Sequence, residues 1–335
     1  MTTSDQITKQ ELTNIILPLA KKYNNLEVRI FSEGSDQDQK TFEEGGCTFV
    51  HEGKKYGSCD AVLIYKDLII AIEMTDALNR GSSGSAQIQR FHHALGAVKK
   101  GYLGIYYLRH GKNTIQPVLY GMAVNCSKYS AGKYLITQDL ETVVKLIEKY
   151  IKSKEDYKSY LNDQITKMKG KFDLAFSKNY NDSWDIFAQK RSIIIHKKYV
   201  LKYVSSNYES FTVSSKRAGH ITLGEFFLGK YLFEDLLLNK KKYIFFLPRL
   251  TLNELNKLNV VKNSDKEWLL MKNEPNSLIK TIDDLKGLPK NLYEIIQSIK
   301  LKPMTNGTVA RKKYDDGMKK IVGWIIKENF DFNLN

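Results

Sequence analysis

Two apolar segments separated by a very short loop most constrain the fold of this chain. Residues 57–65 and 68–76 are rich in Val, Ile and Leu, and the loop 66–67 has the length of a two-residue hairpin turn. This spacing predicts two antiparallel strands whose register places Asp60 directly opposite Glu73. Opposed Cβ atoms in such a pair lie about 5 Å apart on one face. The sequence therefore predicts two carboxylates side by side at one end of an apolar hairpin.

Such a carboxylate pair has a specific chemical use. Two like charges so close repel each other, and burying them costs several kcal/mol unless a cation lies between them. Carboxylate oxygens suit Mg²⁺ or Mn²⁺, and such a metal polarises phosphate oxygens and lowers the pKa of bound water. The alternative is that both strand ends emerge into solvent, where two exposed acids need no metal.

The rest of the first half alternates between helix and strand patterns. Apolar residues at helical spacing predict helices over 5–23, 86–100 and 138–152. Apolar or alternating runs predict further strands over 26–31, 47–50, 102–108, 115–124 and 134–137. This order predicts an α/β fold with a mixed sheet flanked by helices.

Chain length and charge indicate two domains with different roles. A chain of 335 residues exceeds one domain of ordinary size, and we place the boundary between residues 152 and 153. Residues 1–150 carry 18 Lys and Arg against 16 Asp and Glu, whereas residues 151–335 carry 34 against 21. The basic second half predicts a polyanionic partner, most simply nucleic acid. The alternative is a general bias toward lysine.

The second half also mixes helix and strand patterns, and we expect a basic α+β domain. Strands are predicted over 191–204, 208–213 and 242–248, and helices over 223–239, 251–258, 276–300 and 307–329. Basic side chains in its loops and strands, together with one in the first half, are candidates for phosphate or base contacts, and for each the alternative is a solvated surface residue: Arg90, Arg191, Lys197, Lys216, Arg217 and His220.

Several classes of protein are disfavoured. No apolar run of about 18 residues predicts a membrane span, and the first residues lack the basic-then-apolar order of a signal peptide. The three cysteines form no Cys-x-x-Cys pair, which argues against a thiolate zinc site and fits a cytoplasmic setting. Phosphate-binding and dinucleotide-binding glycine motifs are also missing from the sequence.

The residues of the hairpin resemble the core motif of the PD-(D/E)XK nuclease superfamily, which includes many restriction endonucleases. Asp60 matches the first acid, and Glu73-Met74-Thr75 follows after a gap. The resemblance implies a restriction-endonuclease-like sheet and Mg²⁺- or Mn²⁺-dependent hydrolysis of DNA phosphodiester bonds. It implies Asp60 and Glu73 as metal ligands, with the Met74 carbonyl as a further one. A type II restriction endonuclease acting on double-stranded DNA is the function expected, and a homodimer is plausible by analogy.

Two departures from the motif keep other functions open. Cys59 stands in place of the motif proline, and Thr75 stands where the motif has a lysine that orients or activates the attacking water. Thr75 and Gln89 are the candidate catalytic residues beside the two acids, and conceivable substitutes for the lysine are Lys54, Lys55 and Lys99. The alternatives are a DNA-binding protein that retains the nuclease fold without cutting, and a repair or RNA nuclease of the same fold.

Overall fold

A computed structural model of the chain describes residues 4–31, 48–51, 54–79, 87–88, 90–177, 208–212, 220–232, 242–247, 251–253, 270–284, 287–299 and 320. The chain divides into two units, Met1–Ala175 and Phe176–Asn335. This division falls later than the boundary expected after residue 152, because helix α7 (Lys154–Ser177) packs on the first unit. The Ile136 N–H, for example, donates to Met168 Sδ of α7 at 3.2 Å.

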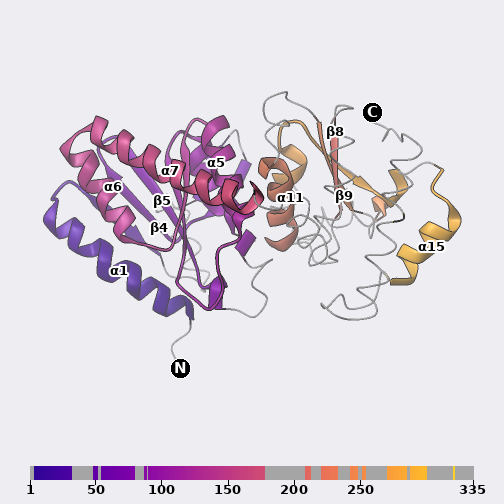
Figure 1. The fold of residues 1–335 in the computed structure, drawn as a ribbon, viewed down its shortest axis with the longest axis horizontal. Coiled ribbons are helices and arrows are strands. Elements are labelled where there is room, and N and C mark those ends of the chain that lie inside the picture. The colour runs from indigo at the N-terminus through magenta and orange to yellow at the C-terminus, as the bar shows by residue number, and fades with distance from the viewer. Residues whose placement is uncertain are drawn as a thin grey trace. The chain divides into compact units, whose positions relative to one another are not determined.

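A five-stranded mixed sheet forms the centre of the first unit (Figure 1). In spatial order its strands are β1 (Glu27–Ile30), β4 (Ala61–Tyr65), β5 (Leu68–Thr75), β6 (Leu103–Leu108) and β7 (Lys133–Thr137). β1, β4 and β5 pair antiparallel, whereas β5, β6 and β7 pair parallel. The predicted α/β class with a mixed sheet flanked by helices is confirmed.

The hairpin has the register that its turn predicts. β4 and β5 pair from Tyr65↔Leu68 at the turn to Ala61↔Ile72 at the far end. Lys66, the first loop residue, has a φ of 54°, the positive value that a two-residue hairpin turn requires. Turn length and strand pattern together therefore fix which residues of the two strands are neighbours.

The strand before Asp60 belongs to a different sheet. A single strand over 57–65 was expected, but β3 (Lys54–Ser58) ends before β4 begins and pairs with β2 (Thr48–His51) in a two-stranded sheet. The chain leaves one sheet and enters the other between these strands, at Cys59 and Asp60. This break between β3 and β4 determines the direction of the Asp60 backbone and side chain.

Helices cover both faces of the five-stranded sheet. α1 (Ser4–Lys22) lies against β5 and beside α6 (Glu141–Lys152) (Figure 1). On the other face lie the 3-10 turn η2 (Phe91–His93) and the short helix α4 (Leu95–Lys99). α4 sits so close to β6 that a Cβ on Gly104 would meet Val98 Cγ2 at 2.7 Å. Each face therefore presents its own set of side chains at the ends of β5 and β6.

Two predicted elements of the first unit are wrong. The expected strand over 115–124 is a helix, α5 (Pro117–Tyr129), which starts at a proline as helices often do. Because β6 and β7 are parallel, the chain between them must cross back over the sheet, which a strand at that place could not do. The expected helix over 86–100 is divided into a short helical piece at 87–88, η2 and α4. Its interruption brings Arg90 and His93 toward the sheet.

The other predicted elements of the first unit are observed within a few residues of their expected bounds: α1, β1, β2, β6, β7 and α6. Between β5 and α4 the 3-10 turn η1 (Ala77–Asn79) was not expected. No helix within the described ranges combines the length and apolar character needed to cross a membrane.

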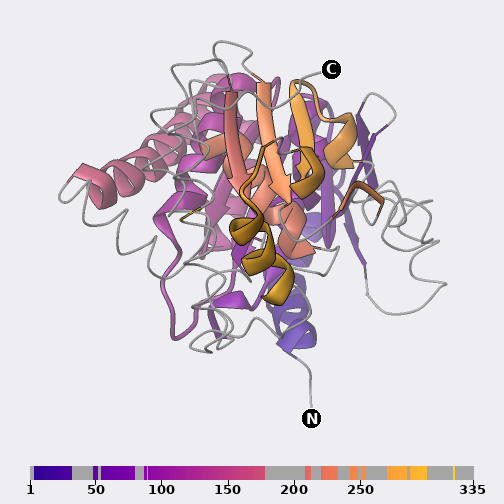
Figure 2. The same cartoon turned by 90° about the vertical axis from the view of Figure 1, so that its right-hand side faces the viewer.

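The second unit contains a parallel three-stranded sheet in the order β10-β9-β8, seen face-on in Figure 2. Its elements are β8 (Tyr208–Thr212), α11 (His220–Leu232), β9 (Lys242–Leu247), β10 (Ser277–Thr281), the 3-10 turn η4 (Ile282–Asp284) and α15 (Lys290–Ile299). The predicted strands over 208–213 and 242–248 are therefore present, and α11 overlaps the first part of the helix predicted over 223–239. The predicted single helix over 276–300 is wrong, because its first residues form β10.

The core of this unit is aromatic, and Phe226 and Phe227 of α11 and Phe245 of β9 are fully buried. A buried ion pair joins Lys230 of α11 to Glu274, with Nζ and Oε2 2.6 Å apart. The predicted strand over 191–204 lies outside the described residues, and so does nearly all of the predicted helix over 307–329.

The hairpin turn is held to the helices by Asp67, which yields a first prediction. Lys154 Nζ lies 2.6 Å from Asp67 Oδ2, and the Tyr150 hydroxyl donates to Oδ1. The hydrogen bonds from Lys154 and then Tyr150 lower the pKa of Asp67 from 3.8 to about 2. The depressed pKa means that the charged form stabilises the fold above pH 4 and that this stabilisation is lost as the pH falls toward 2.

Asp67→Asn should therefore lower the urea midpoint at pH 6 and flatten its decrease between pH 4 and pH 2. The measurement is urea unfolding at a series of pH values, with Asp163→Asn in the exposed middle of α7 as the control. A variant that loses stability in parallel with the wild type across that window would contradict the linkage.

Candidate active site

Asp60 occupies the point where the hairpin ladder ends. Its N–H donates to the Ile72 carbonyl of β5 at 2.9 Å, while its own carbonyl accepts from the Phe31 N–H at 3.0 Å, beyond the end of β1. In a regular antiparallel strand both groups of one residue point to the same neighbour. The backbone therefore bends at Asp60, and the regular cross-strand pair with Glu73 that the register predicts is not formed.

The bend turns the Asp60 carboxylate along β5 instead. Oδ2 accepts a hydrogen bond of 2.7 Å from the Met74 N–H, and the Asp60 side chain is 4% exposed. The Thr75 carbonyl, by contrast, accepts from the Arg109 N–H beyond β6, so alternate residues of β5 face opposite neighbours. Because the N–H and C=O of one strand residue point the same way, the Met74 carbonyl also faces the side of Asp60. A carboxylate and a carbonyl oxygen thus lie at one strand end.

Glu73 is the most deeply buried acid of the site, at 1% exposure. Its Oε1 lies 3.3 Å from Arg90 Nη1, and its Oε2 lies 3.1 Å from His93 Nδ1. Both partners come from the turn that crosses the sheet face. A buried carboxylate requires such compensation, since an isolated charge in the interior costs many kcal/mol.

Tyr106 lies beside Glu73 and was not predicted as a site residue. The parallel register pairs the two positions across β5 and β6. The Tyr106 hydroxyl is buried and meets no hydrogen-bond partner within the described part of the chain. Burial and then the negative charges of Glu73 and Asp60 raise the pKa of Tyr106, while Arg90 opposes them. These four residues therefore form one electrostatic cluster.

Thr75 has a local structural contact. Its side chain is 7% exposed, and Oγ1 accepts the Ala77 N–H at 3.2 Å. The hydroxyl thus satisfies a backbone donor where β5 ends and η1 begins. A lysine at this position could not accept that hydrogen bond, because an ammonium group has donors alone.

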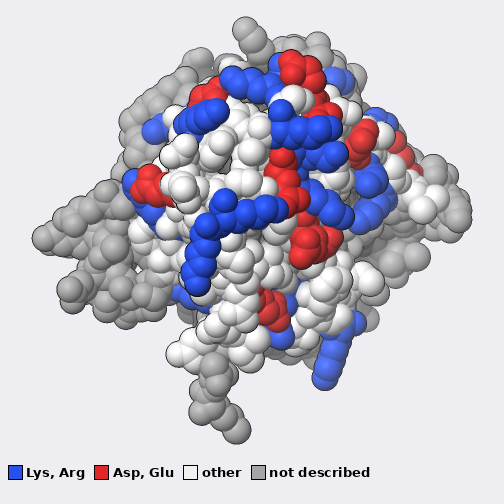
Figure 3. Space-filling view, turned by 90° about the vertical axis from the view of Figure 1, so that its left-hand side faces the viewer, with Lys and Arg blue, Asp and Glu red and all other residues white. Residues whose placement is uncertain are grey.

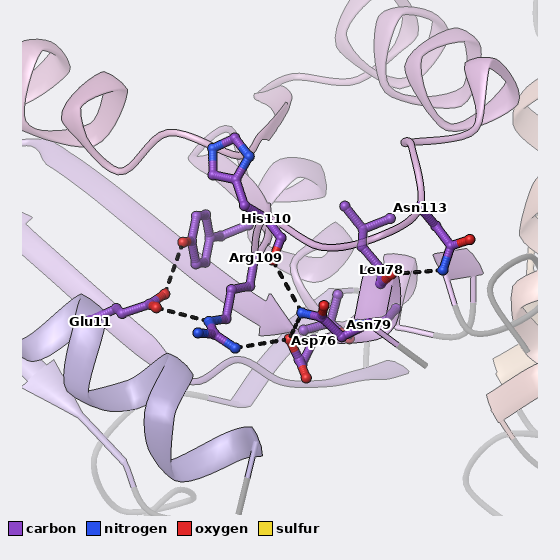
Figure 4. Close-up of polar contacts among 10 residues, drawn as sticks. Glu11, Asp76, Leu78, Asn79, Arg109, His110 and Asn113 are labelled. Atoms are coloured by element: carbon purple, nitrogen blue, oxygen red, sulfur yellow. Dashed lines mark hydrogen bonds and ion pairs between the residues drawn. The ribbon is translucent and has the colours of Figure 1, made fainter. Parts of the chain in front are cut away.

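A second polar cluster lies on the opposite face of the sheet (Figure 4). Arg109 Nε donates to Glu11 Oε1 at 2.8 Å, and Arg109 Nη1 lies 3.4 Å from Asp76 Oδ1. The Tyr107 hydroxyl donates to Glu11 Oε2 at 3.2 Å, and burial, with Glu11, raises the pKa of Tyr107 to about 12. Successive side chains of β6 point to opposite faces, so this cluster is separated by the sheet from the one around Tyr106. It ties α1 to the strand ends.

The same edge is held by amide side chains. Asn79 Nδ2 donates to the His110 carbonyl at 3.1 Å, and Asn113 Nδ2 donates to the Leu78 carbonyl at 2.7 Å (Figure 4). Gln87, which is 1% exposed, accepts the Gln116 N–H at 2.9 Å. These bonds fix the segments that follow β5 and β6, and they give Gln87 a structural role.

Of the remaining predicted site residues, two lie within the described ranges and five lie outside them. Arg90 was predicted to contact nucleic acid, and it lies beside Glu73. His220 is the first residue of α11, in the second unit. Five candidates lie outside the described residues: Gln89, Arg191, Lys197, Lys216 and Arg217.

The residues that surround Asp60 fit a small, hard cation. No three or more His, Cys, Asp and Glu side chains cluster closely enough to hold a metal ion in the described ranges. Mg²⁺, however, is commonly bound by one or two carboxylates plus substrate phosphates. Asp60 and Glu73 supply two carboxylates, the Met74 carbonyl supplies a third oxygen, and the unpartnered Tyr106 hydroxyl lies in their field. The donor set is all oxygen, as Mg²⁺ and Mn²⁺ prefer.

Comparison with known proteins adds no family. A scan of family models, a search of curated proteins and a search of solved structures each found no match to this chain.

Two buried tyrosines test the geometry of the cluster. The Tyr134 hydroxyl donates to the Phe91 carbonyl at 2.6 Å, whereas the Tyr106 hydroxyl lacks a described partner. Tyr134→Phe should lower the free energy of unfolding by about 1–2 kcal/mol, because a buried acceptor loses its donor. Tyr106→Phe should leave it unchanged or raise it slightly, since an unpaired buried group is removed.

Urea unfolding without added metal measures both variants, and each is the control for the other. Equal losses of stability would contradict the assignment of the Tyr106 hydroxyl as unpartnered.

Proposed function

We propose that the chain is a metal-dependent endodeoxyribonuclease of the PD-(D/E)XK type, with a type II restriction endonuclease as its specific form. One observation carries the proposal: Asp60 and Glu73 are both buried at the same end of one hairpin, and Asp60 is bonded to the peptide that follows Glu73. Burial of two acids requires charge compensation, to which a bound cation would add beside Arg90 and His93 at Glu73. Nucleases of this type place their metal at such a pair.

The order of elements supports the same reading. The nuclease core runs helix, three strands, helix, strand. The first unit has α1, the antiparallel strands β1, β4 and β5, the helical segment that ends in α4, and then β6 parallel to β5. β2 and β3 are an addition between the first two strands. The motif residues lie at the end of the central pair, as the resemblance requires.

The proposed chemistry assigns a task to each group. Asp60, Glu73 and the Met74 carbonyl would hold a Mg²⁺ or Mn²⁺ ion, which would polarise a phosphate oxygen and make a bound water more acidic. In the hydrolysis one P–O ester bond breaks, the water oxygen bonds to phosphorus, and the water protons pass to the leaving oxygen and to solvent. The buried hairpin positions the carboxylates and excludes bulk water from their inner side.

Charge distribution supports a nucleic acid as the substrate, and double-stranded DNA is the form that the resemblance implies. The face of the first unit in Figure 3 mixes basic and acidic side chains instead of presenting one basic surface. Within the first unit, basic and acidic side chains also form ion pairs, as in Lys22–Glu148 and Lys154–Asp67. The excess of positive charge lies in residues 151–335, which are therefore proposed to bind the DNA backbone. Two active sites are needed to cut both strands, which makes a homodimer plausible.

A DNA-binding protein without cleavage activity is the second candidate. Both oxygens of Glu73 contact basic side chains, and the motif lysine is replaced by Thr75, whose hydroxyl serves the backbone. A protein that had lost catalysis would retain the buried pair as a structural feature. Cleavage assays separate the two candidates.

Asp60→Asn and Glu73→Gln should each reduce Mg²⁺-dependent cleavage of supercoiled plasmid at least ~100-fold, because each removes a carboxylate from the metal and thereby about 3 kcal/mol of transition-state stabilisation. Asp67→Asn removes an exposed carboxylate from the other end of the same hairpin and should cleave as the wild type does. The assay uses unmodified and modified plasmids, with RNA as a second substrate.

Gel-shift binding measured with the same variants completes the test. Cleavage that survives both site substitutions would exclude this metal site. Binding without cleavage by the wild type on every substrate would favour the second candidate, and cleavage confined to RNA would favour a ribonuclease of the same fold.

A further inference from the structure

The turn over the sheet face presents two basic groups to one buried acid. Arg90 and His93 lie three residues apart in the chain, and each contacts a different oxygen of Glu73. The Glu73 side chain is 1% exposed, whereas that of Arg90 is 25% exposed and that of His93 is 13% exposed. The two basic side chains thus stand between a buried carboxylate and the surface.

This arrangement places Arg90 and a metal ion in competition. A carboxylate oxygen that binds a divalent cation gains more charge compensation than an arginine gives, and the two positive charges repel each other at such a distance. In the absence of metal, Glu73 needs Arg90 and His93 to offset its burial. With the metal site filled, the Arg90 guanidinium is no longer required by Glu73 and lies beside it with part of its surface open.

We infer that Arg90 holds Glu73 in the metal-free protein and turns to the substrate phosphate when the metal site is filled, so that it supplies the positive charge that the motif lacks at Thr75. This inference rests on the proposed nuclease function and names a residue for it. His93 contacts Glu73 from the same side, and it continues to position the Glu73 carboxylate when the metal site is filled. The guanidinium suits the task, because its fork of N–H donors binds phosphate oxygens in pairs.

Lys99 and Arg109, two other basic side chains near the hairpin, make contacts of their own. Lys99 Nζ lies over the Tyr56 ring, 4.9 Å from its centroid. Arg109 is bound to Glu11 and Asp76 on the opposite face of the sheet. Lys100 is exposed at the end of α4. Of the two basic side chains at the Glu73 carboxylate, Arg90 is the more exposed, at 25% against 13% for His93.

Substitution of Arg90 should improve metal binding and impair catalysis. Arg90→Gln should bind Mn²⁺ roughly five- to tenfold more tightly than the wild type in titration calorimetry without DNA, because a competing positive charge is removed. At saturating Mn²⁺ the same variant should cleave plasmid at least ~10-fold more slowly. Arg90→Lys should restore part of the cleavage rate, which loss of structure alone could not explain.

Controls separate this inference from the proposed function. Lys100→Gln removes a positive charge from the same segment and should change neither quantity. Arg90→Met, as a second variant that removes the same charge and keeps the apolar stem, should also tighten Mn²⁺ binding if Arg90→Gln fails to fold. Loss of Mn²⁺ binding in Glu73→Gln would show that the wild-type protein binds the ion through Glu73. If binding is then no tighter in either Arg90 variant, the inference about Arg90 is overturned and the proposed function is not. Wild-type protein that binds no Mn²⁺, or binds it equally well in Glu73→Gln, would overturn the proposed function and this inference with it.

Discussion

The hydrogen bond from the Met74 N–H to the Asp60 carboxylate is the interaction on which the candidate site depends. It replaces the next rung of the β4–β5 ladder, which ends at Ala61 and Ile72. Without a partner there, a buried backbone N–H would remain unsatisfied at a cost of about 1–3 kcal/mol. The side chain of Asp60 therefore completes the hairpin and is fixed by it. The same bond holds the carboxylate next to the peptide that carries Glu73.

The sequence was sufficient to predict the hairpin because a two-residue turn leaves a single register for its strands. It was insufficient at Asp60, since the switch from the β2–β3 sheet to the larger sheet depends on partners far along the chain. The strand predicted over residues 115–124 is wrong for a related reason. A short apolar run is compatible with a strand or a buried helix, and the parallel pairing of β6 with β7 decides in favour of the helix.

The candidate site was predictable where its residues share the hairpin and unpredictable where they come from other elements. The turn places Asp60 and Glu73 at one end of the hairpin, although their direct pairing is not formed, and Met74 comes from the resemblance to the nuclease motif. Tyr106 reaches Glu73 through the register of a parallel pair, which no local pattern specifies. His93 and Arg90 reach it from the segment that is interrupted at η2, where their spacing of three residues places them on one side of the turn. Interrupted helices carry little signal in a single sequence.

Thr75 and Arg90 can be understood together through the direction of hydrogen bonds at the end of β5. The Thr75 position needs an acceptor for the Ala77 N–H, which a threonine hydroxyl provides and an ammonium group cannot. A cation for the Glu73 side of the site must then come from outside the strand. The segment that crosses this face contributes Arg90 at 3.3 Å from Glu73, with part of its side chain open to the surface. In the proposed site the positive charge is therefore supplied by the turn above the strand, while Thr75 keeps the acceptor that the Ala77 N–H uses.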